Sequence, residues 1–155
     1  MNKKVIIGCD HAAVEVKNQL VKYLESEGYE VTDSGTYTAD SCDYPAEAHK
    51  VCLRIQSGEF EKGILLCGTG IGISIAANKH KGIRAALCSD PLSAELARLH
   101  NNANIVCCGA RILGFELICR IADTFLTTET LMTERHMRRR AMLDKLDDGR
   151  DPADD

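Results

Sequence analysis

A cysteine stands among glycines near the middle of the chain. Residues 63–79 read GILLCGTGIGISIAANK, with an apolar run before Cys67 and glycines at positions 68, 70 and 72. A strand that ends in glycine and opens a helix brings backbone N–H groups to one point, where the helix dipole favours negative charge. Beside a helix N-terminus, a cysteine can supply thiolate near neutral pH. The stretch offers a candidate base or nucleophile beside an anion site; the alternative is a glycine-rich turn with an inert core cysteine.

Two histidines also occupy positions that suit chemistry. Asp10-His11 follows the apolar run at residues 5–9, where two polar side chains can form part of a binding site. The alternative is an aspartate that only caps a helix, next to a surface histidine. His100-Asn101 ends a predicted helix. A histidine there can act as a general acid or base near neutrality, or it is only a favourable partner of the helix dipole.

The last predicted helix is strongly basic at its start. Residues 134–140 read ERHMRRR, and Arg135 and Arg139 are four apart, so they share one helix face. Arginine binds phosphate through paired hydrogen bonds, so this face can grip a phosphate; the alternative is a solvated basic face or a weak nucleic-acid patch. The helix follows the last predicted strand and crossover, so it could reach a second subunit and supply its arginines there.

The composition is that of an ordinary globular protein. The chain has 155 residues, of which 45% are hydrophobic and 27% charged, with a net charge of −4. No apolar run approaches the roughly 18 to 20 residues that span a bilayer. The N-terminus leads directly into a strand-like run and not into a signal peptide. We expect one cytoplasmic domain over residues 1–146, no general attraction to nucleic acid or membrane, and an acidic, disordered tail over 147–155.

The eight cysteines do not form a disulfide or metal pattern. There is no C-x-x-C pair and no Cys/His cluster with zinc-finger spacing. Most lie in or just after apolar strand-like runs (Cys9, Cys67, Cys88, Cys107 and Cys108) or at helical core positions (Cys52 and Cys119). We interpret them as reduced cysteines that act as small hydrophobes.

Apolar runs and helical patterns alternate along the chain. The predicted strands are residues 5–9, 29–31, 64–66, 83–88 and 103–108; the predicted helices are 12–27, 45–57, 73–79, one begun by Ser89 or Asp90, 114–126 and 133–146. This order predicts a parallel sheet covered on both faces. Ligands bind such sheets beyond the carboxyl ends of the strands, so one rim should hold Asp10-His11, residues 67–72, Ser89-Asp90 and residues 109–111.

Several segments together resemble the B-type ribose-5-phosphate isomerases, a family related to galactose-6-phosphate and allose-6-phosphate isomerases. The matching segments are GCDHA at 8–12, DYP at 43–45, CGTGIGISIAANK at 67–79, GIRAALC at 82–88, HNNANIV at 100–106, GAR at 109–111 and ERHMRRR at 134–140. The resemblance implies a five-stranded, Rossmann-like α/β/α sandwich. It also implies a dimer or a pair of dimers with sites between subunits, and no metal or organic cofactor.

The resemblance implies a role for each candidate residue. Cys67 would be the base that moves a proton between C2 and C1 of the sugar, and Thr69 would assist proton traffic to the oxygens. His100 would open the furanose ring, with Asp10 holding the ring oxygen or a hydroxyl. The backbone N–H groups of Gly68, Gly70, Ile71 and Gly72 would hold the enediolate oxygens; Asn101 would contact the sugar; the phosphate would be bound by His11, Arg111, Arg135 and Arg139.

Some members of the family lack the cysteine and place a glutamate a few residues further on. Here Ser74 and Ile75 offer no carboxylate, so the cysteine version applies. The sequence leaves three alternatives: an isomerase of a six-carbon sugar phosphate, a non-catalytic phosphosugar-binding subunit, and a redox-responsive thiol protein. It does not decide the sugar, nor between dimer and tetramer.

Overall fold

The predicted alternation of strands and helices is confirmed by the computed structural model, which describes residues 2–153. The strands are β1 (Lys4–Cys9), β2 (Glu30–Asp33), β3 (Gly63–Cys67), β4 (Ala85–Leu87) and β5 (Ile105–Gly109). A short 3-10 helix, η1 (His11–Ala13), precedes the helices α1 (Val14–Ser26), α2 (Tyr44–Gln56), α3 (Ile71–Ala77), α4 (Pro91–Asn101), α5 (Phe115–Thr127) and α6 (Glu134–Asp147). No helix of the described chain is both long and apolar enough to cross a membrane.

The five strands form one parallel sheet in the order β2-β1-β3-β5-β4. The chain moves outward in one direction from β1 to β2 and in the other direction from β1 to β3, so the order switches between β1 and β3. Ligands of open α/β sheets bind beyond the carboxyl ends at such a switch. Cys67, the last residue of β3, therefore lies at the expected binding edge.

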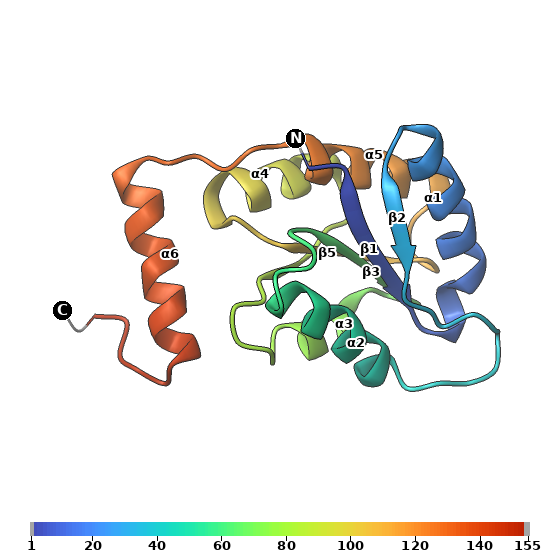
Figure 1. Ribbon diagram of the computed structural model, residues 1–155, viewed down its shortest axis with the longest axis horizontal. Coiled ribbons are helices and arrows are strands. Elements are labelled where there is room, and N and C mark those ends of the chain that lie inside the picture. Colours follow the sequence, from blue (N-terminus) through green and yellow to red (C-terminus); the bar gives the residue numbers. More distant parts are fainter. Residues whose placement is uncertain (1, 154–155) are drawn as a thin grey trace.

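Helices cover both faces of the sheet, as the predicted three-layer sandwich requires (Figure 1). Because side chains alternate along a strand, Ile64 and Leu66 pack with helices α1, α4 and α5, whereas Leu65 and Cys67 pack with α2 and α3. Helix α6 contributes to neither core cluster and stands apart from the sheet at the left of Figure 1.

Some element boundaries differ from the prediction. Helix α3 begins at Ile71, two residues before the predicted start, because Gly70 adopts a positive φ of 76° and ends the turn. Strand β4 is shorter than the predicted 83–88, since the Arg84 N–H donates to the Asn104 side chain (2.8 Å) and not to a neighbouring strand.

The segment expected to be a disordered tail begins with ordered residues. Helix α6 extends to Asp147, whose carboxylate accepts a hydrogen bond of 2.7 Å from the Gly82 N–H. Asp148 forms an ion pair with Lys81. These contacts connect the end of α6 to the turn before β4. Residues 154–155 lie outside the described part of the chain.

Candidate active site

Three neighbouring strands, β1, β3 and β5, bring three of the four predicted groups of rim residues to one edge of the sheet. The Asp10 N–H donates to the Leu66 carbonyl (3.1 Å), and Cys67 is paired with Gly109 across β3 and β5. The Arg111 N–H donates to the Gly68 carbonyl (2.9 Å). The structure therefore brings together Asp10, the Cys67 turn and the segment that carries Arg111.

Cys67 points into the interior from the end of β3, and only 4% of its surface is exposed. Its Sγ accepts a hydrogen bond of 3.0 Å from the Gly70 N–H, which closes the turn. The next N–H, of Ile71, donates to Thr69 Oγ1 (3.2 Å). Two of the N–H groups expected to hold substrate oxygens thus have acceptors within the turn. The donor on sulfur stabilises negative charge there, which a base at this position needs.

The other core cysteines are poor candidates for a thiolate. Burial raises the pKa of Cys9, Cys52 and Cys108 to about 12 and that of Cys88 and Cys119 to about 11. The pKa of Cys107 is also raised well above its ordinary value by burial. These six side chains stay protonated at neutral pH. All eight cysteines are free thiols, and no group of three or more metal-ligand side chains is found in residues 2–153.

Close backbone packing requires glycine at two positions, Gly70 in the Cys67 turn and Gly109 at the end of β5. A Cβ on Gly109 would lie 2.5 Å from the Thr69 carbonyl oxygen. A Cβ on Gly70 would lie 2.8 Å from the Cys108 carbonyl carbon, and its positive φ also favours glycine. Side chains at either position would push the two strand ends apart. The glycines therefore allow the Cys67 turn to lie directly against β5.

Arg111 and Tyr44 each lie against a glycine of the turn. The Arg111 guanidinium lies close to Gly68, with Nη1 3.3 Å from the position of a Cβ there. The Tyr44 ring, at the start of α2, lies 2.7 Å from the equivalent position on Gly72. No site role was predicted for Tyr44. The sequence feature that could have identified Tyr44 is the DYP segment at residues 43–45, one of the motifs that carried the family resemblance.

Asp10 and His11 follow β1 at the same edge. Asp10 Oδ1 accepts a hydrogen bond of 3.0 Å from the Ala12 N–H, so the N-cap alternative is confirmed for this oxygen. His11 Nδ1 accepts a hydrogen bond of 3.2 Å from the Cys42 N–H. Capping uses only one carboxylate oxygen, and the second oxygen of Asp10 has no hydrogen-bond donor among residues 2–153.

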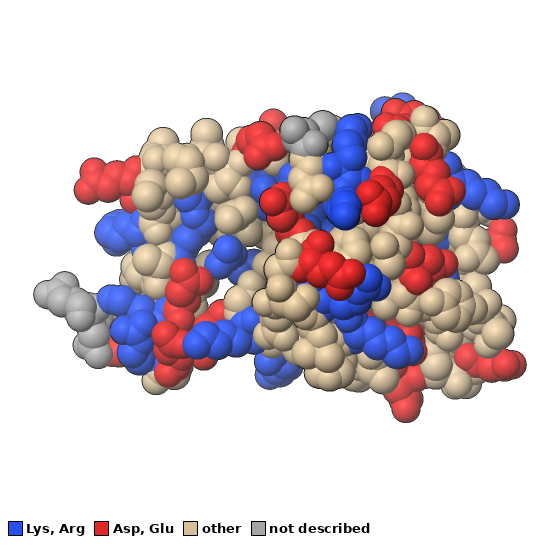
Figure 2. All heavy atoms as spheres, viewed as in Figure 1, with Lys and Arg blue, Asp and Glu red and all other residues tan. Residues whose placement is uncertain are grey.

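The remaining predicted residues form a second cluster on helices α4 and α6. His100, Asn101, Arg135 and Arg139 line a hollow of about 310 Å³, together with His136, Arg140 and Leu143. Arg135 and Arg139 are exposed, and neither pairs with a carboxylate in residues 2–153. Figure 2 shows basic side chains at the left end of the molecule, over α6 and the neighbouring surface, with acidic side chains among them.

His136 and Arg140 hold this second cluster in place. The His136 ring stacks on the His100 ring, with centroids 4.7 Å apart and planes 12° apart. Burial and the neighbouring His100 lower the pKa of His136. Arg140 is buried and donates to the Leu131 carbonyl (2.9 Å), so its guanidinium ties α6 to the preceding segment. Neither residue was predicted to belong to the site; both stand in the ERHMRRR motif.

The two clusters lie at opposite ends of the sheet. Helix α4 starts at the carboxyl end of β4 and runs back, so His100 in its last turn lies near the amino ends of the strands. There Ile105 pairs with Gly63, whereas Cys67 pairs with Gly109. A strand of this length spans roughly 15 Å. One copy of the chain therefore does not bring His100, Arg135 and Arg139 to Cys67.

Three known proteins that are similar to this chain in sequence or in structure are sugar-phosphate isomerases or their subunits. Residues 5–143 match the family described as ribose/galactose isomerase. The chain is 48% identical over 124 residues to a ribose-5-phosphate isomerase B of Escherichia coli, covering 80% of this chain and 83% of the relative. It is 42% identical over 132 residues to a galactose-6-phosphate isomerase subunit of Clostridium acetobutylicum, covering 85% and 76%. The solved type B ribose 5-phosphate isomerase of Leishmania infantum superposes with a TM-score of 0.92 at 46% identity, covering 96% and 99%.

Proposed function

Since this chain belongs to the ribose/galactose isomerase family, we propose that it interconverts ribose 5-phosphate and ribulose 5-phosphate through an enediolate. The chain is a sugar-phosphate isomerase. The observation that carries the proposal is the Cys67 turn: a thiol at the switch in strand order, with a main-chain donor on its sulfur and Asp10 beside it. The reaction needs a base next to a carbonyl, and no covalent adduct.

Cys67 removes the proton from the carbon next to the carbonyl. A positioned general base contributes on the order of 10² to 10⁴ in rate. The negative charge that develops on oxygen needs preorganised donors, each worth about 2.7 to 4 kcal/mol in a measured case. The N–H groups of Gly70 and Ile71 are already bonded, so we assign this task to the other donors of the turn. Gly72 is among them, since first-turn residues of a helix have no intrahelical acceptor.

A second copy of the chain completes the site. His100 of that copy opens the furanose ring, and Arg135 and Arg139 bind the phosphate together with His11 and Arg111 of the first copy. The separation of the two clusters within one chain supports this arrangement. Remote phosphate binding then positions the reacting carbons.

An exposed apolar surface supports the same arrangement. Large apolar side chains are exposed on β4, the strand at one edge of the sheet, and on helices α3 and α4: Ile71, Ile75, Leu87, Leu92 and Leu96. The most exposed of these five side chains, Leu92, has 61% of its surface in solvent. Exposed apolar groups on neighbouring elements are typical of protein interfaces. We propose that this edge packs against the second copy.

Isomerisation kinetics on ribose 5-phosphate, allose 6-phosphate and galactose 6-phosphate, measured side by side, test the proposal. We expect the highest kcat/KM with ribose 5-phosphate. A higher value with a six-carbon sugar would contradict the choice of sugar and leave the isomerase chemistry intact. Binding of all three sugars with no turnover would indicate a phosphosugar-binding subunit. Reversible loss of activity on mild oxidation would favour the redox-responsive alternative.

A further inference from the structure

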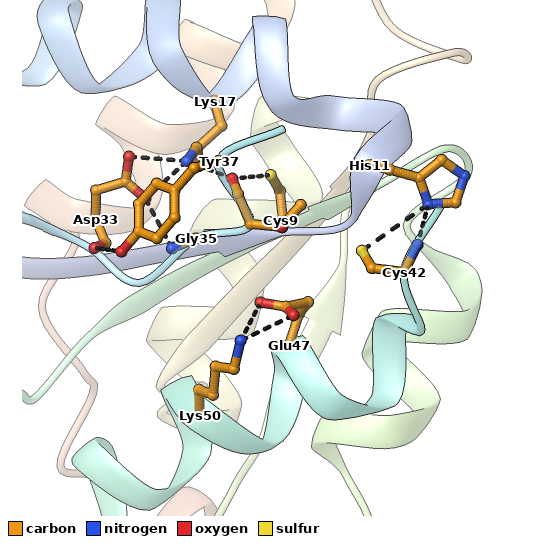
Figure 3. Close-up of polar contacts among 10 residues, drawn as sticks. Cys9, His11, Lys17, Asp33, Gly35, Tyr37, Cys42, Glu47 and Lys50 are labelled. Carbon is orange, nitrogen blue, oxygen red and sulfur yellow. Dashed lines mark hydrogen bonds and ion pairs between the residues drawn. The ribbon is translucent and has the colours of Figure 1, made fainter. Parts of the chain in front are cut away.

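Lys17 is a charged side chain inside the protein. It projects from the buried face of α1, at helical spacing from Leu20 and Leu24, and is fully buried. Its ammonium donates to both carboxylate oxygens of Asp33 and to the Thr36 carbonyl, each at 2.8 Å (Figure 3). Burying a charge is costly unless it is paired, and these acceptors satisfy the three donors of the ammonium group. The side chain therefore has one well-defined position.

The acceptors of Lys17 belong to the 33–43 loop, by which we mean Asp33 at the end of β2 and the residues that join it to α2. Asp33 also accepts a hydrogen bond of 2.9 Å from the Gly35 N–H. The Gly35 carbonyl accepts from the Cys9 N–H (2.7 Å), and the Thr36 N–H donates back to the Cys9 carbonyl (2.8 Å). The first half of the loop is thus fixed to the end of β1.

The second half of the loop contacts His11. The Cys42 N–H donates to His11 Nδ1 at 3.2 Å, and Figure 3 shows the other ring nitrogen turned away from Cys42. A backbone N–H can only donate, so Nδ1 must carry its lone pair. The hydrogen of the neutral ring is then on Nε2, which is available as a donor.

We propose that Lys17 is a positioning residue for His11. Through Asp33 and the 33–43 loop it holds the Cys42 N–H against His11 Nδ1, which keeps His11 in the tautomer that presents Nε2–H to an anionic group of the substrate. The tautomer follows from the contacts alone. Only the anion that receives the hydrogen bond rests on the proposed function.

The tautomer can be read by ¹⁵N NMR of the imidazole ring in the free protein, above the pH at which His11 protonates. The full-length protein should show an unprotonated Nδ1 and a protonated Nε2. In Lys17→Met, the ring signals should move toward the average of the two tautomers. The KM for ribose 5-phosphate should rise by roughly tenfold, the loss of about one hydrogen bond to a charged group, with kcat near the original value. Lys22→Met, an exposed lysine of the same helix, should change neither quantity.

A second variant separates positioning from folding. Removing Lys17 alone leaves the Asp33 charge unpaired, whereas Lys17→Met combined with Asp33→Asn leaves no unpaired charge. Both variants should show the tautomer shift while they remain folded. Unchanged His11 signals in the folded variants, or a protonated Nδ1 in the original protein, would overturn the proposal. An inactive protein with the expected tautomer would instead overturn the proposed function.

Discussion

Replacing Cys67 by serine tests the proposed base with a small structural change. The hydroxyl can still accept the hydrogen bond that the Gly70 N–H gives to Sγ at 3.0 Å, so the turn keeps its shape. A serine hydroxyl is not a base at neutral pH. We expect kcat to fall by about 10² to 10⁴, which corresponds to roughly 3 to 5.5 kcal/mol of lost transition-state stabilisation, with KM little changed.

Cys67→Ala adds a structural effect to the same loss. It leaves the Gly70 N–H without its acceptor in a nearly buried turn, which costs about 1 to 3 kcal/mol of stability. Turnover should nearly vanish while the substrate still binds. The measurements are initial rates of ketose formation, calorimetric binding of ribose 5-phosphate, and urea denaturation of each variant.

Cys119→Ser is the matched control for both variants. Cys119 is similarly buried, at 6% exposed against 4% for Cys67, but it lies on α5 away from the turn. Its replacement should lower stability without changing kcat. Turnover like that of the original protein in Cys67→Ser and Cys67→Ala would eliminate Cys67 as the base.

Three further substitutions test other parts of the account. Gly109→Ala should destabilise the protein by about 3 kcal/mol in urea denaturation, because its Cβ would lie 2.5 Å from the Thr69 oxygen; Gly114→Ala, where a Cβ meets nothing within 4 Å, is the control, and equal stability of the two variants would refute the close packing. His136→Asn should reduce the pH dependence of stability. The pKa of His136 is lower in the folded protein than the ordinary histidine pKa of about 6.5 in the unfolded chain. Its contribution to stability is therefore present above pH 6.5 and is lost as the pH falls through the folded pKa. An unchanged dependence would contradict this. His100→Asn should impair turnover of cyclic substrate far more than that of an open-chain analogue, and equal losses would exclude a ring-opening role.

The cluster of Asp10, Cys67 and Arg111 was predictable from the sequence. Local apolar runs identify the strands, and parallel pairing places the carboxyl ends of the strands side by side. Asp10, Cys67 and Arg111 each follow an apolar run, and the carboxyl ends of neighbouring parallel strands meet at one edge. The internal hydrogen bonds of the turn were not predictable, since they depend on the positive φ of Gly70. The predicted convergence of N–H groups is therefore only partly available to a ligand.

Other features depend on contacts between distant segments. Lys17 lies on the buried face of α1 with Leu20 and Leu24, and a charged side chain can be buried there because it pairs with Asp33, sixteen residues away on another element. Leu92 and Leu96 repeat at helical spacing, which suggests a core face, yet they lie in solvent in a single copy. Sequence periodicity indicates that a face is apolar and does not say what covers it.

Mixing two variants that turn over the cyclic substrate poorly tests most directly whether each site is built from two copies of the chain. Cys67→Ser keeps an intact His100 cluster, and His100→Asn keeps an intact Cys67 turn. If they are mixed at equal amounts and reassembled at random as two-fold dimers, half of the dimers are hybrids and each hybrid has one intact site of two. Activity should therefore return to about a quarter of that of the original protein. A mixture that reassembles and stays as inactive as its components would contradict the shared site.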